Sequence, residues 1–345
     1  MTNSSKKNQA EEVITLAHGH GGLQSHRLIR EAFLPAFSSP ELDPLDDAAV
    51  IDLPSSRIAF STDSFVVQPL FFPGGDIGKL AVAGTVNDVA VMGAKPLVIA
   101  VSLIVEEGFS FHELSVIAKS IADTSRKAGV RIVTGDTKVV PKGACDKLFI
   151  NTTGIGIRRD DCELSGAFAR PGQAIIMTGP AGDHGAAIIC ARNDLGIAGE
   201  IESDCRPIAD LLMSVLDSAA NKITVMRDPT RGGLATTLNE ICRSSGVGME
   251  IDEEKVPVRS TTQAICEILG FDPLYLANEG ASLIICDPDA TDDVLGVCRE
   301  HPAGEHASVI GYVRDDLGGK VILKTASGGR RIMDMLAGEM LPRIC

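Results

Sequence analysis

The 345-residue chain contains no tryptophan, and aromatic residues make up only 4% of it. Proteins that bind single-stranded nucleic acid stack the bases on aromatic side chains, so this mode of binding is not expected. Basic residues are also too few to balance the acidic ones, and the net charge of −14 has the wrong sign for contact with a phosphate backbone. We therefore predict no nucleic-acid partner. A polyphosphate ligand would need metal ions to bridge the like charges.

Long apolar runs are missing as well. The start of the chain has no segment of the kind found in signal peptides, and the longest apolar stretch, 97–105, is far shorter than the ~20 residues that span a bilayer. The nine cysteines include no CxxC pair, which argues against a disulfide framework and a structural zinc site. Cysteines in apolar segments are expected in the core, namely Cys190, Cys242, Cys266 and Cys286. The sequence predicts a protein of the reducing cytoplasm with no membrane partner.

Alternating strand and helix patterns indicate an α/β (α+β) protein with two domains. Strands are expected at 57–62, 96–105, 130–133, 148–157, 174–178, 282–286, 308–313 and 320–323. Helices are expected at 77–92, 110–127, 208–221, 233–244 and 261–269. We divide the chain into an N-terminal segment (1–40), a first domain (41–160), a second domain (161–326) and a mobile tail (327–345).

Carboxylates recur in short segments of the first half. Asp46 and Asp47 lie in LDDAAVI, Asp63 in FSTDSF, Asn87 and Asp88 in GTVNDVAVMGAKP, and Asp136 in TGDTKVV. Each segment places its carboxylate beside small or hydroxyl residues next to an apolar run, so turns could direct the carboxylates toward one point. Mg²⁺ binds carboxylates together with substrate phosphates. Any single aspartate also fits a turn or a cap, but their recurrence favours a metal–phosphate site.

A glycine-rich segment, HGHGG at 18–22, precedes a helix predicted to start at Gln24. Backbone N–H groups of such loops bind phosphates at helix N-termini. Gly19, Gly21 and Gly22 are therefore candidate phosphate ligands. The segment matches neither GxxxxGK[ST] nor GxGxxG, and its histidines fit solvent-facing loop positions equally well.

The chain ends on a cysteine, Cys345. A thiolate is the strongest nucleophile among ordinary side chains, and chain ends are mobile unless they are docked. A reactive sulfur on such an arm could be modified in one site and carried to a partner. A terminal cysteine without any function is the simpler alternative.

These segments, together with RDPTRGGL, NEGASL and the terminal PRIC, resemble in order and spacing the HypE family of hydrogenase maturation proteins. That family is similar to aminoimidazole ribonucleotide synthetase, selenophosphate synthetase and thiamine-monophosphate kinase, a group that uses ATP. The resemblance covers the chain from about residue 14 to its end. It implies the two-domain fold of that synthetase, with N-terminal sheets that pair into a dimeric barrel and a flexible C-terminal tail.

The resemblance also implies a reaction, the ATP-dependent dehydration of a carboxamide carried by the sulfur of Cys345. The carbamoyltransferase HypF would place the carboxamide, and ATP would phosphorylate its oxygen to make a better leaving group. Loss of phosphate and the amide protons would leave a protein thiocyanate, which supplies cyanide ligands for [NiFe]-hydrogenase by way of the HypC–HypD complex. The implied cofactors are ATP and Mg²⁺, and the implied assembly is a homodimer.

Roles for single residues follow from the same resemblance. The implied catalytic residues are Cys345, Glu279 as the base that removes the amide proton, and Lys138 facing the γ-phosphate or the amide oxygen. The implied cofactor-binding residues are Gly19, Gly21, Gly22, Asp63, Asn87, Asp88, Asp136, Asp228 and Arg231. The implied metal ligands are Asp46, Asp47, Asp63, Asp88 and Asp136.

Structural alternatives remain open for three of these positions. Lys138 also fits a solvated strand edge, and Glu279 fits an ordinary turn carboxylate. Asp228 or Thr230 is expected to cap the helix that follows RDPTRGGL, while the Arg-Gly-Gly turn could bring N–H groups near a phosphate.

Two other functions fit part of the sequence. A small-molecule ATP-dependent kinase or synthetase of the same group would share the aspartate motifs but would have no use for a terminal thiol. A protein that only carries a modified cysteine would not need the predicted Mg²⁺ site. The dehydratase alone uses both features, and it is the function that the sequence predicts.

Overall fold

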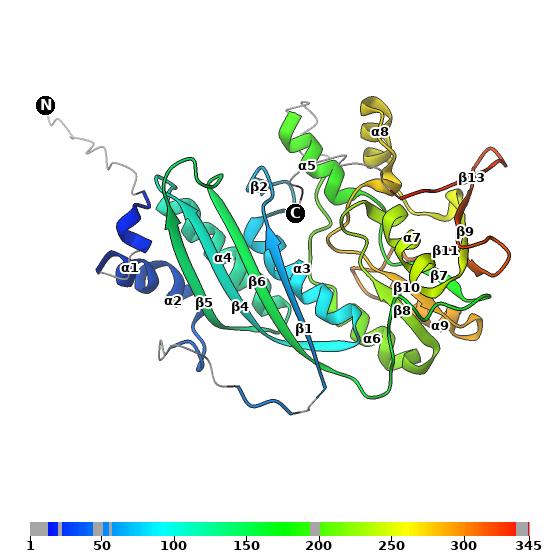
Figure 1. Cartoon of the computed structure of the whole chain (residues 1–345), viewed down its shortest axis with the longest axis horizontal. Helices are drawn as coiled ribbons and strands as arrows, with labels where there is room; N and C mark the ends of the chain where they lie inside the picture. The colour runs from blue at the N-terminus through cyan, green and yellow to red at the C-terminus, as the bar shows by residue number, and fades with distance from the viewer. Residues whose placement is uncertain are drawn as a thin grey trace, which may run out of the picture.

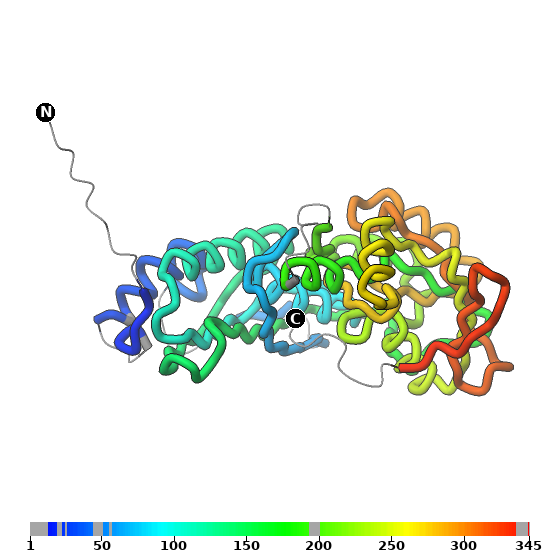
Figure 2. The backbone as a smooth tube through the Cα atoms, turned by 90° about the horizontal axis from the view of Figure 1, so that it is seen from above, coloured from blue at the N-terminus to red at the C-terminus, as the bar shows by residue number. Residues whose placement is uncertain are grey.

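A computed structural model of the chain describes residues 13–19, 23–43, 51–54, 57–193, 201–335 and 344. They form two α/β domains that lie side by side (Figures 1 and 2). The N-terminal domain is built on a four-stranded sheet and the C-terminal domain on a seven-stranded sheet. The predicted two-domain α/β fold is confirmed.

The first sheet has the strand order β1–β6–β4–β5. Its strands are β1 (Ile58–Phe65), β4 (Ala94–Glu106), β5 (Arg131–Val140) and β6 (Leu148–Arg158). Pairing is antiparallel except between β4 and β5, which are parallel and joined by a crossover helix. Helices α3 (Ile77–Val91) and α4 (Phe111–Lys127) cover one face. The opposite face is open in the described part of the chain, and Phe60 on β1 remains 65% exposed there.

Local hydrogen bonds explain where α3 and α4 begin. The Asp76 carboxylate accepts from the N–H groups of Gly78 and Lys79, and the Ser110 hydroxyl accepts from the N–H of Glu113. The start of the helix predicted at 110–127 is therefore confirmed, with Ser110 as its N-cap. Helix α3 is buried along most of its length because it lies between the first sheet and the second domain.

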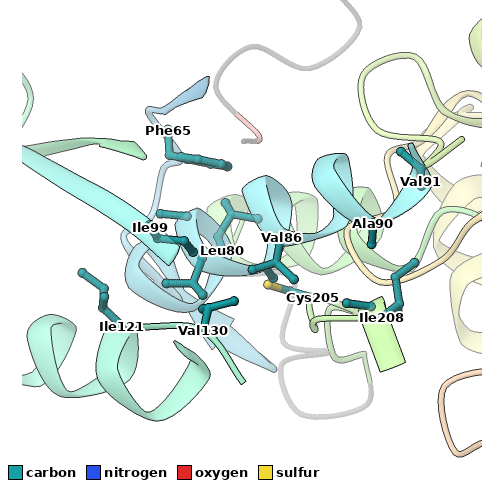
Figure 3. Packing of buried hydrophobic residues seen from close by; sticks show 14 of the residues in the cluster. Phe65, Leu80, Val86, Ala90, Val91, Ile99, Ile121, Val130, Cys205 and Ile208 are labelled. Atoms are coloured by element: carbon teal, nitrogen blue, oxygen red, sulfur yellow. The ribbon is translucent and has the colours of Figure 1, made fainter. Parts of the chain in front are cut away.

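The packing of α3 joins the two domains. Figure 3 shows Val86 and Ala90 of α3 pointing toward Cys205 and Ile208, which belong to the C-terminal domain and to the same apolar cluster. These side chains share one continuous apolar cluster with the first sheet. Since a shared core resists relative movement of its parts, α3 holds residues of the two domains in a constant arrangement.

The second sheet has the order β13–β12–β9–β11–β7–β10–β8. Its strands are β7 (Ala174–Met177), β8 (Ile223–Arg227), β9 (Gly248–Asp252), β10 (Leu283–Cys286), β11 (Ser308–Arg314), β12 (Val321–Lys324) and β13 (Arg330–Ile332). Its helices are α5 (Asp183–Asn193), α6 (Ala209–Ala219), α7 (Gly233–Ser245), α8 (Ser260–Leu269) and α9 (Thr291–Glu300). Helices α6 and α9 share an apolar cluster with Ile176 and Ile284, and α7 shares another with Ile175 and Ile285. The central strands are therefore covered on both faces.

Smaller elements complete the fold. Helix α1 (Leu23–Leu28) leads through the short helix η2 (Ile29–Phe33) to α2 (Leu34–Phe37), and η2 and α2 lie beside α4. The short strands β2 (Phe71–Phe72) and β3 (Gly75–Asp76) form a hairpin before α3. The cysteines predicted to be core residues are buried. Among the described residues, no helix has the length and apolar character needed to cross a membrane.

Part of the predicted mobile tail (327–345) belongs to the second sheet. Strand β13 pairs with β12, and the fully buried Met333 donates its N–H to the Val321 carbonyl at 2.9 Å. The prediction is wrong for these residues because a turn at Gly328, which has a φ of +84°, returns the chain to the sheet edge. Residues 336–343 and 345 lie outside the described residues.

Candidate active site

Acidic side chains from both domains converge around α3. Asp63 lies on β1 and Asp88 on α3, whereas Asp228 follows β8 and Glu279 precedes β10. We call these four residues the acidic cluster. Glu279 is 3% exposed and Asp228 is 9% exposed. The Asp88 carboxylate accepts a hydrogen bond of 2.7 Å from the Ser61 hydroxyl. The sequence predicted all four positions, and the structure brings them together.

Burial raises the pKa of every carboxyl group in the acidic cluster, and repulsion by neighbouring carboxylates adds to it for Asp63, Asp228 and Glu279. Burial, followed by the charge of Asp88, raises the pKa of Asp63 to about 6 and that of Asp228 to about 7. Burial also raises the pKa of Asp88, and it raises that of Glu279 well above the ordinary range, with the charge of Asp228 as the next cause. A bound cation relieves such repulsion, so the cluster suits a divalent metal ion.

Two arginines border the acidic cluster: Arg227 is the last residue of β8, and Arg231 lies in the segment that follows it. The charge of Arg231 lowers the pKa of Asp63, which opposes the effect of burial, and the charge of Arg227 does the same for Asp88 and Asp228. A recess of about 470 Å³ lies beside Asp88, Arg227 and Asp228. Positive side chains next to a cation-binding cluster suit an anionic ligand that arrives with its own metal ion.

Helix α7 begins at this recess without a side-chain cap. The prediction that Asp228 or Thr230 caps it is wrong, because the residue before the helix is Gly232, with a φ of +74°, and no side chain caps the first turn. Gly233 also has a positive φ, and a Cβ there would lie 2.4 Å from the Leu276 carbonyl oxygen. The glycines thus permit a close turn, in which the Gly233 N–H donates to the Thr230 carbonyl oxygen at 2.9 Å and no side chain competes with an anion for the other N–H groups of the first turn.

Glu279 is held in place through its backbone by Asp204, a residue for which the sequence carries no motif. The Asp204 carboxylate accepts hydrogen bonds from the Glu279 N–H at 3.0 Å, the Gly280 N–H at 3.1 Å and the Asn278 amide at 2.8 Å. A Cβ at Gly280 would lie 1.9 Å from the Asp204 carbonyl oxygen, so only glycine fits. The Glu279 carboxylate points to α3, since a Cβ added at Gly84 would lie 3.8 Å from Glu279 Oε2.

Asn87 has a different position from the one expected for a cofactor ligand. It is 2% exposed, and its side-chain oxygen accepts from the Ile208 N–H at 2.8 Å. Its amide nitrogen donates to the carbonyl oxygens of Arg206 at 3.1 Å and Glu279 at 3.4 Å. These bonds make Asn87 a joint between the domains, directly beside Asp88.

Asp136 and Lys138 lie on the other side of the first sheet from Asp63. Asp136 is in register with Ser102 on the open face, whereas Asp63 is in register with the buried Thr152 on the helix-covered face. Strands β1 and β5 are also at opposite edges, about 14 Å apart at ~4.8 Å per strand. The expectation that all these side chains meet at one point does not hold within one chain, because neighbouring positions on a strand face opposite ways.

Asp136 and Lys138 instead border a second pocket, with a volume of about 280 Å³. Its walls are mainly apolar side chains of the N-terminal helices and of the first sheet: Leu28, Ile29, Phe33, Leu34, Phe37, Leu42, Val101, Leu103 and Ile132. His18 also lines it, is 6% exposed, and accepts from the Thr15 N–H at 3.1 Å through Nδ1. The alternative of a solvent-facing His18 is therefore wrong.

Of the remaining predicted site residues, the structure describes only Gly19. Gly19 ends a short 3-10 helix, η1 (Leu16–Gly19), just before α1. Gly21, Gly22, Asp46, Asp47 and Cys345 lie outside the described residues. Within the described ranges, no group of three or more His, Cys, Asp or Glu side chains is arranged to hold a metal ion alone. The acidic cluster needs further oxygen ligands, and ligand phosphates are the usual source for Mg²⁺.

Ile344 lies at the boundary between the domains. Ile344, the residue before the last, is 8% exposed and belongs to the apolar cluster that contains α3. Its carbonyl oxygen lies 2.6 Å from Nε2 of His184 on α5. Ile344 thus docks inside the molecule, on an element of the C-terminal domain.

Comparison with known proteins identifies the class first. A model of the AIR synthase related protein N-terminal domain matches residues 45–158, and a model of the AIR synthase related protein C-terminal domain matches residues 170–324. The chain is thus a two-domain protein of the AIR synthase type, with the acidic cluster between the domains.

Full-length relatives narrow the family. The carbamoyl dehydratase HypE of Azotobacter vinelandii is 47% identical over 96% of this chain and 97% of its own length. The crystal structure of HypE in complex with ATP has a TM-score of 0.92 and 48% identity, and covers 96% of this chain and 99% of that one. A HypE–HypF complex structure gives a TM-score of 0.79 and 44% identity over 90% and 99% of the two chains. The chain belongs to the HypE family.

Proposed function

We propose that the protein is an ATP-dependent carbamoyl dehydratase that converts an S-carboxamide on its own Cys345 into a thiocyanate for [NiFe]-hydrogenase maturation. The main support is the docked C-terminus: Ile344 is buried between the domains, in the same apolar cluster as α3, which carries Asp88. A substrate carried by the next residue would thereby be delivered to the interior of its own enzyme. The family and the ATP complex of a HypE relative agree with this function.

The acidic cluster supplies what the phosphoryl transfer needs from the protein. Asp63, Asp88 and Asp228 would hold Mg²⁺, and Arg231 with the uncapped start of α7 would bind phosphate oxygens of ATP. When bound, Mg²⁺ spreads the charge that develops on the transferred phosphoryl group. Asp228, the most buried of these groups, lies at the inner end of the site, away from bulk water.

Glu279 is the proposed base. As the carboxamide oxygen forms its bond to the γ-phosphorus and ADP leaves, Glu279 takes one proton from the amide nitrogen. The C–O bond then breaks, the departing phosphate takes the second proton from nitrogen, and the C≡N group remains on sulfur. The burial that raises the pKa of Glu279 also makes its carboxylate a stronger base.

We infer that a second copy of the chain supplies Asp136 and Lys138. These residues cannot reach the acidic cluster of their own chain, and they lie on the open face of the first sheet. Pairing two open faces into a barrel would cover Phe60, Ile58 and Ile104, which are 65%, 42% and 42% exposed.

Partners and compartment follow from the same function. We propose that HypF carbamoylates Cys345 and that a HypC–HypD complex receives the cyanide, as the HypE–HypF complex of relatives suggests for the first step. We also propose a cytoplasmic location. All cysteines in the described ranges are free thiols, a state that persists in a reducing compartment.

Intact mass spectrometry tests the proposed function. The full chain is incubated with HypF, carbamoyl phosphate and ATP, then again without each component. The chain should gain a carbamoyl group with HypF, and addition of Mg²⁺ and ATP should convert it to a cyano group on the C-terminal peptide. A small-molecule kinase or synthetase would instead consume ATP with a new substrate while its own mass stayed constant.

A further inference from the structure

His184 is a buried histidine for which the reaction above has no role. It lies in the first turn of α5, is 0% exposed, and has both ring nitrogens in hydrogen bonds. Nε2 lies 2.6 Å from the Ile344 carbonyl oxygen, and Nδ1 lies 2.8 Å from the Ser203 hydroxyl. Phe72, from the first domain, packs edge-on to the imidazole ring at a centroid distance of 5.5 Å. We call His184, Ser203 and Phe72 the tail receptor.

In the tail receptor each group donates a hydrogen bond to the next, from Cys205 through Ser203 and His184 to Ile344. The Cys205 N–H donates to the Ser203 hydroxyl at 3.0 Å, so the hydroxyl hydrogen is available for His184 Nδ1. With Nδ1 as acceptor, the ring proton is on Nε2 and is donated to the Ile344 carbonyl oxygen. Burial is the main reason why the pKa of His184 is lowered to about 4. The charge of Arg192 lowers it further, whereas the hydrogen bond to Ile344 raises it. The ring is therefore neutral at pH 7.

The group that His184 binds is the last peptide group of the chain. The Ile344 carbonyl belongs to the amide that joins Ile344 to Cys345. Recognition of this oxygen does not depend on whether the sulfur is free, carbamoylated or cyanated. The side chain of Ile344 adds apolar contact, since it is 8% exposed within the core. The tail receptor thus binds the backbone of the residue immediately before the cysteine, and not the cysteine side chain.

Hydrogen bonds connect the segments that carry the tail receptor to the segment that carries Glu279. The Gly185 N–H, one residue after His184, donates to the Ala277 carbonyl at 3.0 Å. Ser203 directly precedes Asp204, which binds the N–H of Glu279. Movement of the tail receptor relative to Glu279 would have to break these hydrogen bonds. The docked peptide group and the base are therefore kept at a constant separation.

We propose that His184, oriented by Ser203, is a positioning residue that docks the C-terminal peptide group so that the group carried by Cys345 meets Glu279. The docking half of this inference, that His184 holds the C-terminal peptide group, stands on the structure alone. The catalytic half, that this docking brings the group on Cys345 to Glu279, rests on the proposed function. Holding a reactant in place raises its effective concentration. His184 should therefore affect the dehydration step, and leave ATP binding and carbamoylation by HypF unchanged.

The docking half is tested by the accessibility of the terminal thiol. Wild type, His184→Leu, His184→Gln and Ser203→Ala chains are treated with N-ethylmaleimide for short times, and modification of the C-terminal peptide is followed by mass spectrometry. His184→Leu removes the donor, so its terminal thiol should react roughly 5- to 10-fold faster, as expected for the loss of one buried hydrogen bond. His184→Gln keeps a donor and should react like wild type. His306→Leu, on an exposed histidine, is the matched control.

Equal reaction rates in wild type and His184→Leu would overturn the docking. If His184→Leu does not fold, Ser203→Ala carries the same test: it keeps the ring but no longer fixes its tautomer, and its terminal thiol should react faster than that of wild type. Modification of Ser203→Ala at the wild-type rate would then overturn the role of Ser203 and the hydrogen-bond order on which the inference stands.

The catalytic half is tested on chains that are carbamoylated beforehand. In single-turnover reactions with ATP and Mg²⁺, His184→Leu should form thiocyanate about 10-fold more slowly, with recovery in His184→Gln and an unchanged KM for ATP. A normal rate in a variant with an unprotected thiol would overturn the positioning role. Absence of thiocyanate in wild type would overturn the proposed function instead, while the difference in thiol protection would still support docking.

Discussion

The acidic cluster and the pocket beside Asp136 contain the same kinds of residues in opposite settings. Asp63, Asp88, Asp228 and Glu279 are gathered between the domains, where burial raises the pKa of each carboxyl group. Asp136 is exposed on the open face of an edge strand, and its carboxylate accepts from the Thr137 N–H at 2.8 Å. Similar motifs therefore produce a repelling, cation-binding cluster in one place and a solvated carboxylate in the other. The covering of the sheet by α3 makes the difference.

The largest effect is expected in the buried region, for Asp88→Asn. Loss of one carboxylate leaves the cation poorly held, so ATP turnover should be abolished, while the asparagine can still accept from Ser61 and the fold should persist. ATP hydrolysis and near-ultraviolet circular dichroism measure the two outcomes. Asp123→Asn on the surface of α4 is the matched control and should keep full turnover. Wild-type turnover in a folded Asp88→Asn protein would contradict the metal assignment.

Glu279→Gln should show whether Glu279 acts as the base of the reaction or as a ligand in the phosphate site. The substitution keeps size and polarity but removes the proton acceptor, so thiocyanate formation should fall by roughly 10²–10⁴-fold. ATP affinity should change little. Single-turnover mass spectrometry and equilibrium nucleotide binding give the two values. Loss of nucleotide binding together with activity would place Glu279 in the phosphate site and remove it as the base.

Mixing two inactive variants tests whether the two regions meet across a dimer. Chains with Lys138→Ala and chains with Glu279→Gln are unfolded, mixed in equal amounts and refolded. If Lys138 serves the acidic cluster of the partner copy, each mixed dimer has one intact site, and turnover should recover to about a quarter of wild type. Refolding each variant alone is the control. No recovery, with mixed dimers verified by mass, would mean that both residues serve the same chain.

The smallest expected effect is a pH dependence of stability that comes from the acidic cluster. Because the pKa of Asp228 is raised to about 7 in the folded state, the folded protein binds more protons than the unfolded chain between about pH 4 and 7. Stability is then fully present at low pH and is lost as pH rises through 7. His184, whose pKa is lowered to about 4, acts in the opposite direction only below about pH 6.5.

Thermal unfolding between pH 6.5 and 8 isolates this effect. Without metal, Tm should fall by a few degrees across the interval, and saturating Mg²⁺ with a non-hydrolysable ATP analogue should reduce the slope because the cation stabilises the ionised carboxylates. Asp228→Asn should flatten the slope as well. A slope that neither metal nor Asp228→Asn alters would show that other groups control it.

Most regular elements could be predicted because their signals are local. Ser110 with Glu113 marks the start of α4, and the small-residue helix before Gly93 is α3. Strand β8 was missed, since a strand of five residues that is buried on four of them has no alternation to detect. Strand β13 was taken for tail because exposed arginines on an edge strand resemble a solvated terminus.

The site shows the same division between local and non-local information. Asp63, Asp88, Asp228 and Glu279 were recognisable from short motifs that resemble the HypE family. Asp204 and His184 carried no such signal, because each acts through hydrogen bonds to segments far away in the chain: Asp204 to Glu279, and His184 to Ile344. Partners of this kind become neighbours only after the chain has folded.

The sequence by itself determined the family, the α/β class, the acidic residues and the terminal thiol, since each depends on residue types at short spacings. Tertiary structure alone decided which carboxylates share a site, because the two-residue period of a strand defines two faces but not the one that α3 covers. It also decided that Asn87 joins the domains and that His184 binds the last peptide group. Burial creates the raised pKa values and the docked terminus, and burial is a property of packing between distant segments.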